Sequence, residues 1–132
     1  MKLRLSVILF YFLFSINSLF ALENKILFKV NNEIVTSVDI LDEIKYLNSL
    51  NTNFDSLGEN KIFEIVKNSL IKEKVKEIFL KNFFKEIELK DEDFNRMAIN
   101  TYSRLGINNI DQLNLHLDKF DIKKKFLEKK FL

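Results

Sequence analysis

Apolar and polar residues alternate near the start of the chain, where two short stretches are joined by a polar pair. In ILFKV (26–30) the apolar residues Ile26, Phe28 and Val30 alternate with other residues, which is the period of a half-buried strand, and EIVT (33–36) follows it. Asn31 and Asn32 between them tolerate the left-handed backbone of a tight turn. The pattern predicts a β-hairpin. Because an isolated hairpin is marginal in water, we expect it to pack on another element.

After the hairpin the apolar spacing changes to three and four residues, which is the period of an α-helix. Thr36 is suited to cap the first helix, and Asp39 lies near its free amides at the positive end of the helix dipole. This helix is expected to run to about Leu50. The polar segment 48–60 is predicted as a loop. The apolar face of the helix carries Ile40, Ile44 and Leu47.

The longest helix is predicted from about Asn60 to Phe84. Its apolar residues form a broad stripe, which indicates neighbours on more than one side. Lys74 and Lys81 are expected on the opposite, polar side, and Glu77 is spaced to pair with Lys81. The stripe consists of Ile62, Phe63, Val66, Leu70, Ile71, Val75, Ile78 and Phe79.

Three further helices are predicted in the C-terminal part of the chain. The first, 91–106, has acids in its first turn and Gly106 as a C-terminal cap. Asn109 and Gln112 form a capping-box pattern before the second, and Asp121 is predicted to cap the third. Their apolar faces are Phe94, Met97, Ala98, Thr101, Tyr102 and Leu105, then Ile110, Leu113, Leu117 and Phe120, then Ile122 and Phe126. The fold class predicted is mainly α, with an N-terminal β-hairpin followed by about five helices.

Residues 1–21 differ from the rest of the chain. MKLR is a short basic start, LSVILFYFLF is an uncharged apolar run, and SINSLFA ends on the small residue Ala21. This layout predicts a secretory signal peptide that is cleaved after Ala21, which leaves 22–132 as the mature domain. The alternative is an uncleaved anchor in the inner membrane, because residues 5–22 could nearly span a bilayer. Asn17 and three serines in that span favour cleavage.

Composition and charge exclude several classes of protein. The hydrophobic fraction of 47% and charged fraction of 30% are those of a folded protein. The whole chain has a formal net charge of +2, but loss of residues 1–21 removes Lys2 and Arg4 and leaves 19 basic and 19 acidic residues. A mature domain without net charge gives no indication of nucleic-acid binding. The chain has no Cys, so its core forms without disulfides.

Residue types that commonly build catalytic sites are scarce. His116 is the only histidine, so a cluster of histidines on a metal and a Cys–His pair are both excluded. We interpret His116 as a surface or boundary residue, because a catalytic histidine needs an orienting partner. The acids at 91–93 fit a role at a helix start better than metal binding. We therefore predict no catalytic, cofactor-binding or metal-ligating residue, no cofactor and no small-molecule substrate.

A basic cluster follows residue 122. Lys123, Lys124 and Lys125 are followed by Lys129 and Lys130, with two phenylalanines interleaved. Interleaved aromatic and basic residues occur in proteins that bind single-stranded nucleic acid. The two phenylalanines, however, have the spacing of an amphipathic helix. We interpret the cluster as the solvated face of a terminal helix.

These motifs together resemble a known family. Residues 24–50, NKILFKVNNEIVTSVDILDEIKYLNSL, are similar to the start of the SurA-type periplasmic chaperones, a strand reading V-V-N-N/D-x-I/V-I/L-T/L followed by a helix that begins near an acid. SLIKEKV (69–75) and IELKDEDFNRMAINTYSRLGI (87–107) resemble two later helices of the family. Lys90 stands where the family prefers Ser or Thr, so Asp91 is expected to cap that helix instead. The matching residues in the first segment are Val30, Asn31, Asn32, Ile34, Val35, Thr36 and Asp39.

The resemblance implies the N-terminal domain of a chaperone for outer-membrane proteins, located in the periplasm and similar to the C-terminal module of trigger factor. Such a domain holds unfolded, aromatic-rich chains on an apolar surface, and its hairpin acts as a clasp between parts of the domain. Family members normally continue into parvulin-type prolyl-isomerase domains, which are not recognised within residues 22–132. We expect uncovered apolar surface and self-association as a result.

Three functions stay open from the sequence. The first is a holdase that binds unfolded outer-membrane proteins. The second is the N-terminal piece of a peptidyl-prolyl isomerase whose catalytic domain is missing from this chain, so that its status as an enzyme is undecided. The third is a membrane-anchored structural or assembly protein.

Overall fold

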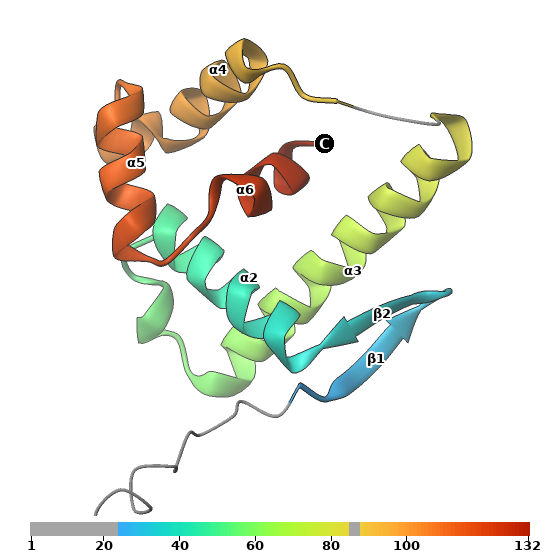
Figure 1. Ribbon diagram of the computed structural model, residues 1–132. Coiled ribbons are helices and arrows are strands. Elements are labelled where there is room, and N and C mark those ends of the chain that lie inside the picture. Colours follow the sequence, from blue (N-terminus) through green and yellow to red (C-terminus); the bar gives the residue numbers. More distant parts are fainter. Residues whose placement is uncertain (1–23, 85–87) are drawn as a thin grey trace, which may run out of the picture.

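The computed structural model describes residues 24–84 and 88–132, so that the predicted signal peptide, 1–21, lies outside the described residues. Within them the chain is mainly helical, and a two-stranded antiparallel hairpin precedes five α-helices (Figure 1). This confirms the predicted fold class at that level. The elements are β1 (Ile26–Val30), β2 (Glu33–Thr36), α2 (Ser37–Leu50), the 3-10 turn η1 (Phe54–Ser56), α3 (Glu59–Phe83), α4 (Asp91–Tyr102), the 3-10 turn η2 (Ser103–Leu105), α5 (Ile110–Lys119) and α6 (Lys124–Phe131).

A tight turn and a helix cap determine how the hairpin leads into α2. Asn31 in the turn has a φ of 54°, in the left-handed region that asparagine tolerates. At the other end of β2, the Thr36 hydroxyl accepts a hydrogen bond from the Asp39 amide at 3.3 Å, and the Asp39 carboxylate accepts one from the Thr36 amide at 2.7 Å. The predicted cap is therefore confirmed as a reciprocal capping box. It fixes the angle at which the hairpin meets α2.

One detail of the hairpin differs from the prediction. Phe28 and Val30 are half-buried, but Ile26 is exposed. The pairing of β1 with β2 shifts register between Ile26 and Phe28. Because side chains alternate between the two faces of a strand, such a shift turns the first residue away from the buried face.

The core consists of two apolar clusters that share α2. The first joins β2, α2, η1 and α3, and the second joins α4, α5 and α6. Tyr46 and Leu50 of α2 pack against the second cluster, whereas Ile40 belongs to the first. Figure 1 shows α6 between the other helices, beside α2. The buried residues are Val35, Ile40, Phe54, Val66 and Leu70 in the first cluster, and Phe94, Ala98, Tyr102, Ile107, Leu113, Leu117, Ile122 and Leu127 in the second.

A small polar junction joins α2, α4 and α5. Ser49 donates its hydroxyl hydrogen to the Tyr46 carbonyl at 2.7 Å, so the Tyr102 hydroxyl is the donor in its 2.8 Å bond to Ser49 Oγ. His116 Nε2 lies 2.8 Å from the Ser49 carbonyl, which only accepts, so Nε2 carries the proton. His116 is half-buried and packs against the rings of Tyr102 and Phe120. Its contacts are those of a residue that ties α5 to α2.

The segment between α2 and α3 contains one element that was not predicted. Helix α2 ends at Leu50 and α3 begins at Glu59, close to the predicted bounds, but a 3-10 turn, Phe54–Ser56, interrupts the predicted loop. Gly58 is the N-cap residue of α3, and it has no side-chain atom that could accept a hydrogen bond from the free amides of the helix. Polar composition alone does not show that Phe54 is buried in the first cluster and holds this segment against α2.

Two predicted helix caps are wrong. Asp121 does not cap α6, because it has a φ of 53° two residues earlier than the cap and pairs with Lys45 at 2.9 Å. Asp91 is the first residue of α4 rather than its cap, and it pairs with Lys124 at 2.6 Å. In both cases a lysine from another helix offers the carboxylate a full opposite charge. This charge competes with the free amides at the start of the helix that the carboxylate was predicted to cap.

The cap of α5 and the face of α4 are confirmed only in part. Asn109 accepts a hydrogen bond from the Gln112 amide at 2.9 Å, but the Gln112 side chain accepts one from the amide of Asn108 instead of Asn109.

On α4 the buried residues are spaced by four, at Phe94, Ala98 and Tyr102. The other residues predicted for that face, Met97, Thr101 and Leu105, are exposed, so the buried stripe is narrower than predicted. The predicted helix 91–106 is an α-helix only to Tyr102, and Gly106, with a left-handed φ of 78°, caps the 3-10 turn η2 that follows it rather than α4 itself.

Candidate functional site

Three charged side chains from three helices meet inside the molecule. Glu43 of α2 is 0% exposed, and its carboxylate contacts the Lys130 ammonium of α6. The same ammonium contacts the Glu73 carboxylate of α3, and the Lys130 side chain is only 7% exposed. The Ser69 hydroxyl donates to the other oxygen of Glu43 at 2.6 Å. The buried charges are thus paired and hydrogen-bonded, as burial of an ion requires.

Further ion pairs extend this cluster along α3 to the hairpin. Lys129 Nζ lies 3.2 Å from Glu73 and 3.7 Å from Glu77. Glu77 in turn pairs with Lys74 at 3.3 Å and with Lys81 at 3.0 Å. The pair with Lys81 is the one predicted from its four-residue spacing. Both of these lysines also reach Glu33 of β2, Lys74 at 3.7 Å and Lys81 at 2.9 Å. We call this set of residues the ion-pair network; it links α2, α3, α6 and β2.

Two predictions about these lysines are wrong. Lys74 was expected on the polar face of its helix but is buried, and Lys130 was expected on a solvated face. Their spacing carries a signal for this outcome. Lys74 follows Leu70 by four residues and Lys130 follows Leu127 by three, so each continues the buried face of its helix. The sequence does not show that the carboxylates of Glu43 and Glu73 lie where they can pair with Lys130.

The network shifts several pKa values. Burial raises the pKa of Glu73, but the hydrogen bonds and charges of Lys130 and Lys129 outweigh burial and lower the pKa overall. Glu77 behaves in the same way, with burial opposed mainly by the Lys81 hydrogen bond, and its pKa is also lowered. Burial, together with the charges of Tyr102, Glu43 and Glu73, raises the pKa of Tyr46 to about 12. The lowered pKa values favour the ionised forms of Glu73 and Glu77.

Acid is expected to destabilise the protein through these two carboxylates. The pKa values of folded Glu73 and Glu77 lie below their ordinary value of 4.5, so their contribution to stability is complete above that pH. It is lost as the pH falls through the lowered values. Urea unfolding measured from about pH 7 to about pH 3 should show this loss, and Glu73→Gln should flatten it. An equally steep loss in Glu73→Gln would contradict the assignment to Glu73.

The outer face of α3 carries large apolar side chains that nothing in the described part of the chain covers. Val75, Phe79 and Phe83 are 55%, 59% and 68% exposed, and the two phenylalanine rings contact each other with centroids 4.6 Å apart. We call these three residues the α3 stripe. At 100° per residue, the stripe points away from Val66 and Leu70, which enter the core. Of the predicted apolar stripe, Val66 and Leu70 are thus buried, whereas Phe63, Val75 and Phe79 are exposed; the half-buried remainder is Ile62, Ile71 and Ile78.

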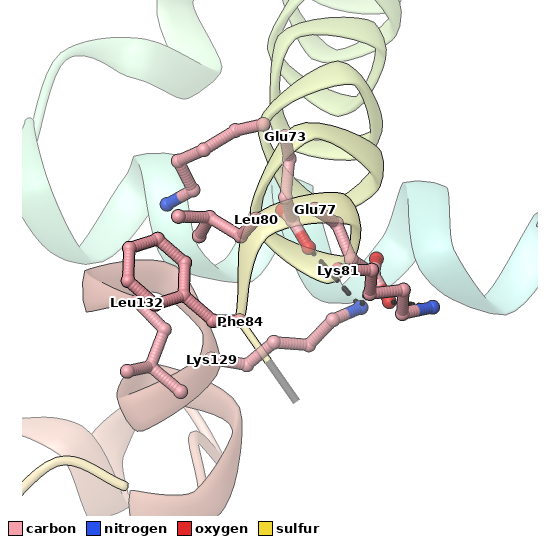
Figure 2. A pocket seen from close by; sticks show the side chains of 8 residues that line it. Glu73, Glu77, Leu80, Lys81, Phe84, Lys129 and Leu132 are labelled. Carbon is pink, nitrogen blue, oxygen red and sulfur yellow. Dashed lines mark ion pairs between the residues drawn. The ribbon is translucent and has the colours of Figure 1, made fainter. Parts of the chain in front are cut away.

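A groove lies next to this stripe, between the C-terminal ends of α3 and α6. It encloses about 250 Å³. Figure 2 shows the side chains of Leu80, Phe84 and Leu132 gathered at it, with the Glu77–Lys129 pair alongside. Lys76 also lines the groove, and its ammonium donates to the Lys130 carbonyl at 3.0 Å. The combination of an exposed apolar stripe and an apolar groove makes this end of α3 the candidate binding surface.

Residues 24–84 and 88–132 contain no group of three or more His, Cys, Asp or Glu arranged to hold a metal ion. Over the same residues, no helix combines the length and apolar character needed to cross a membrane. No protein-family model, curated protein or solved structure matches this chain. The candidate surface is therefore interpreted from its own contacts and charges.

Proposed function

We propose that this protein is a periplasmic chaperone domain that holds unfolded segments of outer-membrane proteins on the outer face of α3, without catalysing a reaction. The observation that carries the proposal is the α3 stripe, in which Val75, Phe79 and Phe83 are each more than half exposed and adjacent. Contiguous apolar surface on a folded protein is typical of an interaction site. The resemblance to SurA-type chaperones and the predicted signal peptide support the location and the class of client.

The size of the stripe suits reversible binding. Complete burial of a Val or Phe side chain is worth roughly 1.5–3 kcal/mol, and these three are already partly buried. About 3–5 kcal/mol of apolar burial is available from the stripe, and association costs consume much of that. One client segment is therefore expected to bind weakly and to leave again. A holdase needs this property, because it must release its client to the folding machinery.

Removal of the two phenylalanines is expected to abolish holdase activity without unfolding the protein. The purified protein at a near-equimolar ratio should delay the aggregation of an unfolded outer-membrane β-barrel protein. Phe79→Ser/Phe83→Ser should lose most of that delay, because it removes the apolar surface on which the client is held. Its stability should change little, since both side chains are exposed.

The matched control is Leu115→Ser, because Leu115 is 65% exposed on α5, outside the stripe. This variant should delay aggregation as well as the wild type does. The proposed function fails if the wild-type protein delays aggregation no more than an inert helical protein, or if the double variant is as active as the wild type.

A further inference from the structure

Two lysines beside the α3 stripe differ from the other lysines of this region. Lys72 and Lys76 are exposed, and neither has a carboxylate within ion-pair distance among the described residues. By contrast, Lys74, Lys81 and Lys129 are all engaged in the ion-pair network. Lys76 donates to the Lys130 carbonyl at 3.0 Å, which is an uncharged acceptor, so the N-terminal part of the stripe is bordered by two ammonium groups without a carboxylate partner among the described residues.

These lysines share one face of α3 with the stripe. Lys76 precedes Phe79 by three residues and Lys72 precedes Lys76 by four, so successive side chains in this row are neighbours on the helix surface. From Lys72 to Phe83 the helix rises about 16 Å, at ~1.5 Å per residue. An extended peptide covers that distance in about five residues, at ~3.3 Å per residue. One short client segment can therefore contact the lysines and the phenylalanines together.

We infer that this surface selects client segments in which carboxylates lie within about five residues of large apolar side chains. This inference rests on the proposed function and specifies its substrate class. Apolar side chains of the client pack on Phe79 and Phe83, while its carboxylates pair with Lys72 and Lys76. Exposed pairs of this kind contribute modestly to affinity, and they discriminate against segments that bring a like charge to the same place.

A second copy of this chain fits the same face less well. In a symmetric pair each α3 would present the same row to its partner. From Lys72 to Phe83 this row consists of Lys72, Val75, Lys76, Phe79, Asn82 and Phe83, and over that length it offers no carboxylate; Glu64, on the same side of α3, lies eight residues before Lys72. The lysines would stay without opposite charges next to a desolvated apolar contact, which is costly. An acidic client neutralises them.

The test compares three fluorescent peptides with the same apolar residues and with two Glu, two Gln or two Lys at one end. Fluorescence anisotropy with the purified protein should give the Glu peptide about threefold to tenfold tighter binding than the Gln peptide, and the Lys peptide the weakest. The preference should shrink at high salt. Lys72→Gln/Lys76→Gln should remove the preference and leave the affinity for the Gln peptide unchanged.

The control Lys119→Gln/Lys125→Gln makes the same change in net charge at exposed lysines of α5 and α6, and it should keep the preference. Equal binding of all three peptides would overturn the inference and leave the proposed function standing. If none of the peptides bound, both would fail. Binding to phosphatidylglycerol vesicles that required Lys72 and Lys76, with no preference among the peptides, would overturn the inference in favour of a membrane surface.

Discussion

Replacement of Lys130 by methionine is expected to lower the free energy of unfolding by about 3–5 kcal/mol. The Lys130 ammonium is the only described cation that contacts Glu43, whose carboxylate is fully buried. Methionine fills a similar volume but leaves that carboxylate with the Ser69 hydroxyl alone. An uncompensated charge in the interior costs far more than the loss of an exposed ion pair. Glu73 suffers less, because Lys129 stays within 3.2 Å of it.

Urea unfolding followed by far-ultraviolet circular dichroism measures this loss. Lys125→Met is the matched control, because Lys125 lies on the same helix and is exposed, and it should leave the unfolding midpoint unchanged. Glu43→Gln added to Lys130→Met should recover much of the loss, since the amide removes the stranded charge and still accepts from Ser69. A cost below about 1 kcal/mol for Lys130→Met would show that this lysine is solvated in the folded protein.

The ion-pair network and the α3 stripe are two aspects of one arrangement. On the C-terminal half of α3, charged residues such as Glu73 and Lys74 point inward, whereas Val75 and Phe79 point outward. A rotation of this helix that buried the stripe would expose Lys74 and remove Glu73 from Lys130. The buried pairs therefore favour the orientation that keeps the apolar side chains accessible to a client.

Local sequence patterns predicted the elements of this fold well. The hairpin at 26–36, the Thr36–Asp39 pair and the left-handed Gly106 each depend on neighbouring residues, and the structure has all three, although the register shift turns Ile26 away from the buried face. Helix order follows from apolar spacing for the same reason. The 3-10 turn Phe54–Ser56 was not predicted, because its position depends on the burial of Phe54 among residues of other elements.

The candidate surface was much harder to predict. Periodicity shows that a helix has an apolar face, but it does not show whether another element covers that face, so Phe79 could not be distinguished from Val66. Charged residues are mostly exposed, and this general rule placed Lys74 and Lys130 outside. Lys74 pairs with its helix neighbour Glu77 and also with Glu33 of β2. Lys130 pairs with Glu43 of α2 and Glu73 of α3. The pairings with Glu33, Glu43 and Glu73 join residues far apart in the sequence, so no local pattern shows them.

Replacement of Leu127 by alanine is the second substitution expected to have a large effect, a loss of about 2–5 kcal/mol. Leu127 is 0% exposed and lies at the centre of α6, where it enters the cluster formed with α4 and α5. A helix of eight residues is not stable alone in water, so α6 exists because it is docked. Removal of its central anchor leaves a cavity and weakens that docking.

Chemical denaturation gives the size of this loss, and Leu115→Ala, which truncates an exposed leucine on α5, should change the stability by less than about 0.5 kcal/mol. Amide hydrogen exchange then shows where the protein loosens. Because Leu127 and Lys130 lie about one turn apart on the same face, weakened docking of α6 also withdraws the cation from Glu43 and Glu73. We therefore expect exchange in Leu127→Ala to increase most in 124–131 and less in the part of α3 around Val66. A uniform increase over both helices would show instead that α6 and α3 open only in global unfolding.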